Sequence, residues 1–451
     1  MADLNNNRKI DNNMTEGNVF KALLYFTIPL IISGFLQQLY TIADSVIVGN
    51  LVSETALAAV GVSAPVLNVF IYVITGLVSG YTILISQYYG AKDYNKVLKL
   101  TSTFFIFITL FSCFLAAIGF IFNNKILISL NTPVEILQPA IDYLTIIFIG
   151  VPFVVLYNLY SSLLRGIGNS KTPLYSIILS SAINIVLDLV FIYNFGWGIK
   201  GAAVATVISQ VISSIYLCFY VNRYYPMFKV DVKIDSTGLN LFFESLRLSL
   251  PRVIQSAIGS VGGLLLQNIM NSFGFDVVTA ITTAYKIDTL TILPIINISI
   301  AISIFVGQNV GAENMDRAKE GLKKGIIIIL IVSVAVTTIV VSAGFYLMKF
   351  FGVSNEVAQI GQNFFYICGI FYPVFGLENA YSSFLQGNKD VAFTSIVSIM
   401  SLALRLILSY ALASLIGYRV IAVAEMCTWV FAAIVFYARY KSDGWKKYSM
   451  S

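Results

Sequence analysis

The stretch LYSIILSSAINIVLDLVFIYNF, from Leu174 to Phe195, decides the fold class of this chain. It contains a single charged residue, Asp188, and it is long enough to cross a bilayer as a helix, which takes roughly 20 apolar residues. Asn184 and Asp188 are four residues apart, so they share one face of that helix. A carboxylate inside the membrane is costly, and this pair therefore requires a partner or a water-filled cavity.

Apolar runs of this kind recur along the whole chain. Of its 451 residues, 58% are hydrophobic and 11% are charged, whereas soluble domains are about a quarter charged. Barrel strands are excluded because they are short and alternate polar with apolar residues. We therefore predict an all-α integral membrane protein with twelve transmembrane helices. The expected spans are 23–47, 58–86, 101–123, 139–163, 174–195, 201–222, 249–272, 277–306, 325–347, 361–385, 392–415 and 420–438.

The basic residues predict the orientation of these spans. If the N-terminus is cytoplasmic, most of the 28 Lys and Arg residues fall in the inner loops and the two tails. Only Lys125, Lys200, Lys349 and Arg419 then fall outside. This bias follows the positive-inside rule, with both termini in the cytoplasm. It also accounts for the net charge of +6 without nucleic acid as a partner.

The two halves of the chain repeat each other. YSSLLRG at Tyr160 returns as YSSFLQG at Tyr381, and QYYGA at Gln87 returns as QNVGA at Gln308, both 221 residues later. Pro29 matches Pro251 at a spacing of 222, and Gly198 matches Gly417 at 219. Each half holds six spans, an even number, so the halves are parallel repeats related by a pseudo-two-fold axis along the membrane normal. Such repeats are typical of transporters that work by alternating access.

The repeat predicts five parts of the chain. We expect a cytoplasmic N-terminal segment at 1–20, an N-lobe of six helices at 21–222 and a cytoplasmic linker at 223–247. A C-lobe of six helices at 248–438 and a cytoplasmic tail at 439–451 complete the chain.

Polar residues inside the spans are the candidates for function, because each is expensive in the membrane. The N-terminal half offers Asp44, Asn184, Asp188 and Thr206, an acidic cluster without a basic partner in its spans. The C-terminal half offers acids together with bases, as a possible substrate or C-lobe polar site: Lys286, Asp288, Glu378, Arg405 and Glu425. We expect Arg405 to pair partly with Glu425, directly or through water.

The N-terminal cluster suits a small cation. Two buried carboxylates without a counter-ion favour a proton or a metal ion, and their oxygens suit a hard ion such as Na⁺. The sequence contains no histidine, so carboxylates are the proton carriers available near neutral pH. The four cysteines form no metal pattern, and no Walker, HExxH or GxSxG motif is present. We expect no enzymatic activity and no cofactor beyond a coupling ion, H⁺ or Na⁺.

The chain resembles the multidrug and toxic compound extrusion (MATE) family over nearly its whole length. The resemblance rests on IPLIISGFLQQLYTIADSVIVGN, ALAAVGVSAP, SQYYGAKD, LLRGIGNSKTP, NIVLD, GIKGAAVAT, AYKID, VGQNVGAEN and SSFLQGNKD, in this order. It implies two lobes of six helices and outward export of organic cations against an inward flow of H⁺ or Na⁺.

The family also suggests roles for individual residues. One branch has an N-lobe cation site with an Asp fifteen residues after a Pro, an Asn and an Asp four apart, and a Thr. Asp44 after Pro29, Asn184 with Asp188, and Thr206 match this pattern. Pro29 would then be a kink point, because proline removes a backbone donor from the helix. A second branch uses acids in spans seven and ten. Here span seven has none, and Glu378 lies in span ten.

We therefore expect a secondary active multidrug exporter in the cell membrane. Its partners would be small organic cations and membrane lipid, and we expect a monomer. The alternative is a flippase of lipid-linked saccharides or lipids on a related bundle, which would need basic groups such as Lys286 and Arg405 to face phosphate.

Overall fold

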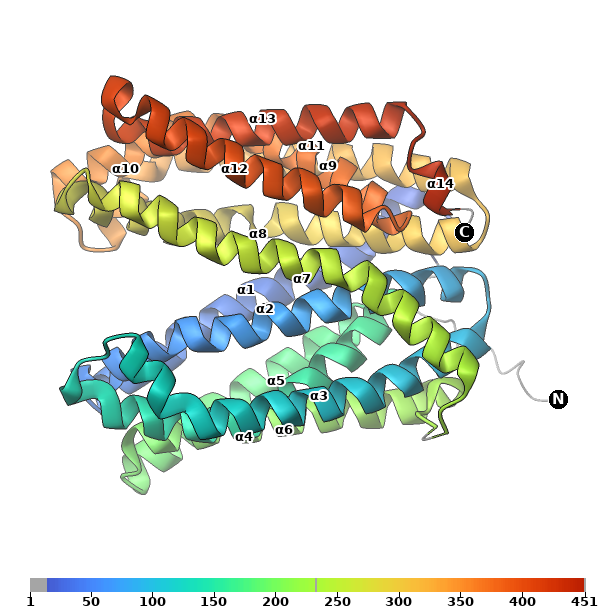
Figure 1. The fold of residues 1–451 in the computed structure, drawn as a ribbon, viewed down its shortest axis with the longest axis horizontal. Helices are drawn as coiled ribbons and strands as arrows, with labels where there is room; N and C mark the ends of the chain where they lie inside the picture. Colours follow the sequence, from blue (N-terminus) through green and yellow to red (C-terminus); the bar gives the residue numbers. More distant parts are fainter. Residues whose placement is uncertain (1–13, 232, 450–451) are drawn as a thin grey trace. The chain divides into compact units, whose positions relative to one another are not determined.

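The computed structural model describes residues 14–231 and 233–449, and all regular structure within these ranges is helical (Figure 1). The expected all-α fold is therefore confirmed. The N-terminal half contains α1 (Val19–Leu51), α2 (Glu54–Gly90), α3 (Tyr94–Ser129), α4 (Val134–Gly166), α5 (Lys171–Asp188), the π-helix η1 (Leu189–Asn194), α6 (Gly198–Tyr224) and η2 (Pro226–Phe228). The C-terminal half contains α7 (Ser236–Asn271), α8 (Phe275–Gly311), α9 (Met315–Phe350), α10 (Asn355–Cys368), η3 (Gly369–Phe371), α11 (Tyr372–Gly387), α12 (Val391–Ile416), η4 (Gly417–Arg419), α13 (Val420–Lys441) and α14 (Lys446–Ser449).

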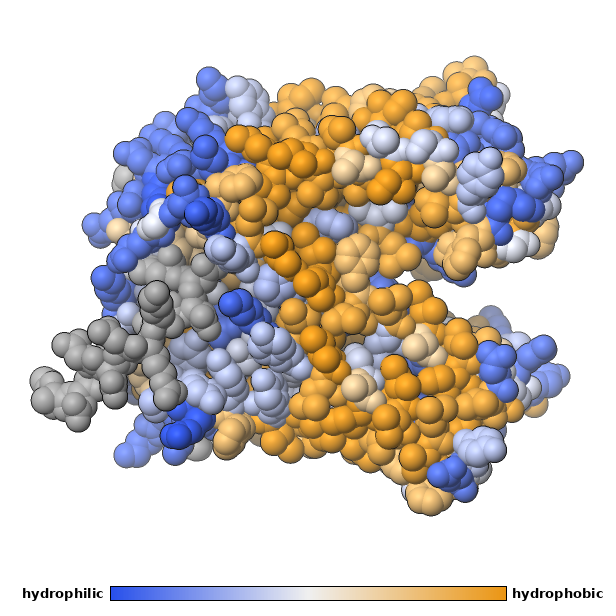
Figure 2. Space-filling view, turned by 180° about the vertical axis from the view of Figure 1, so that it is seen from behind, coloured by the Kyte–Doolittle hydropathy of each residue, from blue (hydrophilic) through white to orange (hydrophobic). Residues whose placement is uncertain are grey.

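The helices are long and apolar enough to cross a membrane. Eleven segments of the described chain qualify, and one of them, Val391–Lys441, has 51 residues and comprises both α12 and α13. Counted as two, it brings the total to the twelve expected spans. Figure 2 shows broad apolar surfaces between polar ends. The protein is therefore a multi-span membrane protein.

The chain forms two compact units. The N-unit is Ile32–Ser249, and the C-unit holds the chain up to Ile31 and from Leu250 onward. Both divisions fall inside helices, α1 and α7, close to Pro29 and Pro251. These units are defined by contacts, so they are a different division from the lobes expected from the repeat (21–222 and 248–438), whose boundaries stay a prediction.

The repeat is visible in the turns of the backbone. At the end of α2, Ala91, Lys92 and Asp93 donate to the carbonyls of Gln87, Tyr89 and Tyr88. At the end of α8, residues 312, 313 and 314 make the same three bonds to 308, 310 and 309. Lys92 and Glu313 both have φ of 58°. The turns after α4 and α11 repeat in the same way, so the 221-residue spacing is structural as well as sequential.

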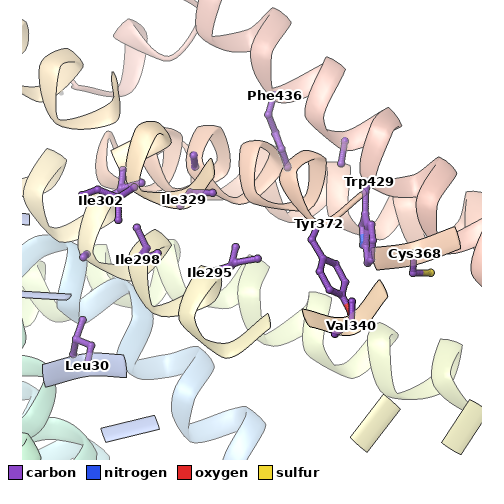
Figure 3. Close-up of a cluster of buried hydrophobic side chains, with 14 of the residues drawn as sticks. Leu30, Ile295, Ile298, Ile302, Ile329, Val340, Cys368, Tyr372, Trp429 and Phe436 are labelled. Carbon is purple, nitrogen blue, oxygen red and sulfur yellow. The ribbon is translucent and has the colours of Figure 1, made fainter. Parts of the chain in front are cut away.

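Each unit has its own apolar core. In the C-unit, Leu30, Ile298, Tyr372 and Trp429 belong to one buried cluster, part of which is drawn in Figure 3. In the N-unit the core includes large buried aromatic side chains such as Phe104, whose ring lies 4.7 Å from that of Tyr81. Packing of this kind holds each bundle together by dispersion and shape, because lipid is as apolar as the core.

Two spans expected as continuous helices are interrupted. The expected span 361–385 is broken at η3, where Pro373 in the first turn of α11 cannot donate to the carbonyl of Gly369 and would clash with it. That carbonyl accepts from the backbone N–H of Tyr372 and also from Thr337 Oγ1, the latter at 2.6 Å. The expected span 174–195 is α-helical only as far as Asp188 and then continues as the π-helix η1.

Candidate functional site

The expected cation site gathers in the N-unit, where three helices supply its four residues. Asp44 lies on α1, Asn184 and Asp188 on α5, and Thr206 on α6. Asn184 and Asp188 have no exposed surface, which follows from their shared face. The structure therefore brings together all four residues predicted for this site.

The amide of Asn184 links α5 to α6. It makes two good hydrogen bonds when Nδ2 donates to Oδ2 of Asp188 at 2.9 Å and Oδ1 accepts from the backbone N–H of Thr206 at 3.2 Å. The opposite orientation leaves one contact of 3.5 Å, from Nδ2 to Thr206 Oγ1. The first orientation satisfies the buried amide, and it fixes one oxygen of Asp188 in place.

The carboxyl groups of Asp44 and Asp188 lie within hydrogen-bonding reach of each other. Each has one buried oxygen, Oδ1, that finds no hydrogen-bond partner among the described residues. Two adjacent carboxylates repel each other, and a buried one without a partner is costly. A shared proton or a small cation would relieve this repulsion.

Two tyrosines complete the surroundings, and sequence reasoning missed both. Tyr40 stands one helical turn before Asp44 and lines the same cavity as Thr206. With Tyr143 on α4, it lines a cavity of about 290 Å³ that also holds Asp44 and Thr206. The four-residue spacing of Tyr40 and Asp44 was the available signal, but tyrosine is common in this chain, with 26 copies.

The helix changes its winding beside the carboxyl pair. Asp188 is the last residue of α5 and is followed directly by η1, where Phe195 N donates to Val190 O over five residues. Widened turns of this kind are frequent at functional sites.

The predicted ligands of the site are oxygen atoms, and two of its four residues are carboxylates. No group of three or more His, Cys, Asp or Glu side chains able to hold a metal ion is found in 14–231 or 233–449. Two carboxylates, an amide and a hydroxyl instead offer oxygen ligands of moderate charge. Such a set suits a proton or a monovalent hard cation that must also leave again.

The C-unit contains the predicted ion pair. Arg405 Nη2 lies 2.8 Å from Glu425 Oε2, and both side chains are mostly buried, at 19% and 11% exposed. Tyr285 joins them, since its hydroxyl accepts from Arg405 Nη2 at 2.8 Å and lies 3.5 Å from Glu425 Oε2. The charges of this pair are therefore largely neutralised within the protein.

The other predicted polar residues of the C-unit are in none of its ion pairs among the described residues. Asp288 accepts a short hydrogen bond from the hydroxyl of Tyr372, which sequence reasoning also missed. Glu378 has a buried oxygen, Oε2, that no described residue bonds. Lys286 is exposed and is in none of the ion pairs found in the described chain, so its role as part of a C-lobe polar or substrate site stays a prediction. Residues two apart on a helix point to opposite sides, which separates Lys286 from Asp288.

Comparison with known proteins gives consistent matches over the whole chain. The MatE family model matches residues 29–190 and 251–411, one match in each half. The chain is 30% identical to the probable multidrug resistance protein YoeA of Bacillus subtilis (strain 168) over 395 residues, 85% of each protein. It is 27% identical to the probable multidrug resistance protein YpnP of the same strain, over 96% of this chain and 97% of YpnP.

Solved structures share the fold. A crystal structure described as MATE in the bent conformation matches with a TM-score of 0.89 over 97% of this chain and 98% of that one, at 24% identity. A transporter of the MOP superfamily from Pyrococcus furiosus matches with a TM-score of 0.87 over 98% of this chain and 99% of that one, at 23% identity. These likenesses show the two-lobe helical fold.

Proposed function

Because the chain belongs to the multidrug and toxic compound extrusion (MATE) family of efflux transporters, we propose that it exports amphipathic organic cations in exchange for inward H⁺ or Na⁺. Export would proceed by alternating access, driven by the ion gradient. We place the protein in the cell membrane, with both termini cytoplasmic because of the charge bias of its loops. We expect it to act as a monomer.

One observation carries the choice of an ion-coupled mechanism. Asp44 and Asp188 lie side by side, each with a buried oxygen that lacks a partner, and neither is in an ion pair within the described chain. If the two carboxyl groups served only to hold helices together, hydrogen-bond donors would be expected to satisfy these oxygens. A site that is incomplete without a cation fits a carrier of that cation.

The proposed cycle assigns a role to each side chain. Asp44 and Asp188 bind the coupling cation between them, Asn184 orients Asp188, and Thr206 supplies a hydroxyl oxygen. Loading neutralises the repulsion between the carboxylates, so α1 and α5 can approach, and unloading restores the repulsion. Because Asp44 lies on α1, fifteen residues after Pro29, loading could bend this helix at the expected kink point.

The C-unit supplies the candidates for contact with the organic cation. Glu425 is already paired with Arg405, whereas Glu378 retains a buried oxygen without a partner. A lipophilic cation would satisfy such an oxygen. Of the two basic groups that a lipid-phosphate flippase would need, Arg405 is paired with Glu425 and only the exposed Lys286 remains for phosphate, so we favour the exporter.

Transport by the purified protein in proteoliposomes tests this proposal. A fluorescent organic cation should move against its own gradient when an opposing H⁺ or Na⁺ gradient is imposed, and should stop when that gradient is collapsed. Imposing a pH gradient with and without Na⁺ separates the two coupling ions. Movement of a fluorescent lipid but not of the organic cation would overturn the exporter in favour of the flippase.

A further inference from the structure

A second cavity in the N-unit has no place in the scheme above. Its volume is about 280 Å³, and neutral polar side chains from four helices form almost all of its wall. They include Gln37 of α1, Tyr157 of α4, Ser180 of α5 and Ser213 of α6, and the sole apolar side chain is Ile177. Gln37 and Thr41 of this wall are exposed, so the cavity opens to the surface of the unit, and its polar wall favours water in the space.

This polar cavity adjoins the cavity of the carboxyl pair. Tyr40, Thr41 and Gln210 line both. From there its wall extends along the helices to seven or eight residues from the ion ligands, as far as Gln37 before Asp44 and Ser180 before Asp188, which is about 10–12 Å at 1.5 Å per residue. On the orientation expected from the basic residues, this displacement points toward the cytoplasm.

A row of polar groups on α4 continues in the same direction. Tyr157, Ser161 and Arg165 are spaced four residues apart and so share one face of the helix. The hydroxyl of Tyr157, Oγ of Ser161 and Nε of Arg165 are each buried without a well-formed hydrogen bond among the described residues. The hydroxyls of Tyr157 and Ser161 lie near each other, and water molecules along this row would complete the hydrogen bonds of all three groups.

We propose that this polar cavity and the row beyond it form a water-filled inner passage, through which the coupling cation passes between the carboxyl pair and the cytoplasm. The inference rests on the proposed function, since it assigns a route to the ion of the same site. Hydroxyl and amide groups solvate a cation without trapping it, and this suits a route better than a store. The volume of about 280 Å³ lies at the lower end of pockets that enclose drug-sized molecules, about 300–1,000 Å³, and we assign the passage to the ion and water.

Filling the passage tests the route. The hydroxyl of Ser180 bonds to the backbone oxygen of Ile177 in its own helix, so the side chain can be exchanged without loss of a contact between helices. Ser180→Leu fills the cavity, whereas Ser180→Ala leaves room for water. The initial rate of gradient-driven export should fall about tenfold in the leucine variant, as expected for a raised barrier, and stay close to wild type in the alanine variant. Substrate binding in detergent at equilibrium should be unchanged in both.

Cysteine accessibility tests the water file without relying on transport. In a background with the four native cysteines replaced by alanine, Ser161→Cys should react with a small cationic methanethiosulfonate added to the cytoplasmic side of inside-out vesicles. Ser86→Cys on α2 is the matched control, because this serine is equally buried, bonds to the oxygen of Ile83 and lines neither cavity. It should not react.

The outcomes separate the passage from the proposed function. Equal export by Ser180→Leu and Ser180→Ala, or equal reactivity of the cysteines at 161 and 86, would overturn the passage and leave the carboxyl site standing. Full export by Asp188→Asn would overturn the proposed function. If Ser161→Cys were nevertheless labelled, the cavity would be hydrated but would carry no coupling ion, and the route would be overturned as well.

Discussion

Breaking the buried ion pair of the C-unit should destabilise the protein without removing ion coupling. Arg405 and Glu425 are 2.8 Å apart and mostly buried. Removal of one partner leaves the other charge buried and alone, which typically costs about 3–5 kcal/mol. For a unit of this size, that loss lowers the midpoint of thermal denaturation by roughly 6–20 °C.

A double-mutant cycle measures the pair itself. Glu425→Gln and Arg405→Met should each be strongly destabilising, whereas the double variant should cost only about 1–2 kcal/mol because no charge is left buried. Tyr285→Phe serves as the control, since it removes one hydrogen-bonding group and should cost about 1 kcal/mol. The assay is thermal denaturation in detergent, followed by export under an ion gradient for the variants that fold.

The result that would refute this reasoning is additivity. If the double variant loses as much stability as the two single variants together, Arg405 and Glu425 do not stabilise each other. If Glu425→Gln keeps its stability but loses its ion dependence, Glu425 belongs to the coupling machinery and its assignment as a paired charge is wrong.

Three further predictions concern the ends of the helices. Arg317 donates three hydrogen bonds of 2.6–3.1 Å to backbone oxygens of the segment before α1, so Arg317→Ala should cost about 2 kcal/mol and speed hydrogen exchange in that segment; unchanged exchange would contradict the contact. The hydrogen bond from Lys99 holds the pKa of Asp235 below its ordinary value of 3.8, so the stabilisation by this contact is present above that pH and lost as pH falls through the lowered pKa. Asp235→Asn should therefore reduce the loss of stability at acid pH, and an unchanged loss would refute the contribution of this contact. Cysteines placed at Ser53 and Asn355 should react from outside intact cells, and reaction only after permeabilisation would reverse the expected topology.

Much of the fold could be predicted because the bilayer sets the length of the apolar spans and the positive-inside rule sets the side of the basic loops. The spans, the charge bias and the 221-residue repeat can each be read from the positions of residues along the sequence. The breaks could not be predicted in this way. Pro373 and Gly369 are in the sequence, but the carbonyl of Gly369 accepts an additional bond from Thr337, which lies on another helix and 32 residues away along the chain. Such a bond depends on packing between helices.

Some residues of the candidate site could likewise be predicted from the sequence, and others could not. Asn184 and Asp188 were found because one helix period places them together, and the three-dimensional site adds Asp44 and Thr206 as expected. The partners Tyr40 and Tyr372 were missed because an aromatic side chain in an apolar span has no polar signal of its own until a neighbour appears. Whether the gathered residues carry an ion stays a prediction.

The most direct test of the central claim is drug efflux by Asp188→Asn under an imposed ion gradient. This variant keeps the size of the side chain and removes the charge beside Asp44, and the account predicts a folded protein that binds substrate but exports none against the gradient. Asn184→Ala should lower export less, because it removes a neutral hydrogen-bonding group. Wild-type efflux by Asp188→Asn, with its thermal stability changed instead, would show that this carboxylate only holds the helices together.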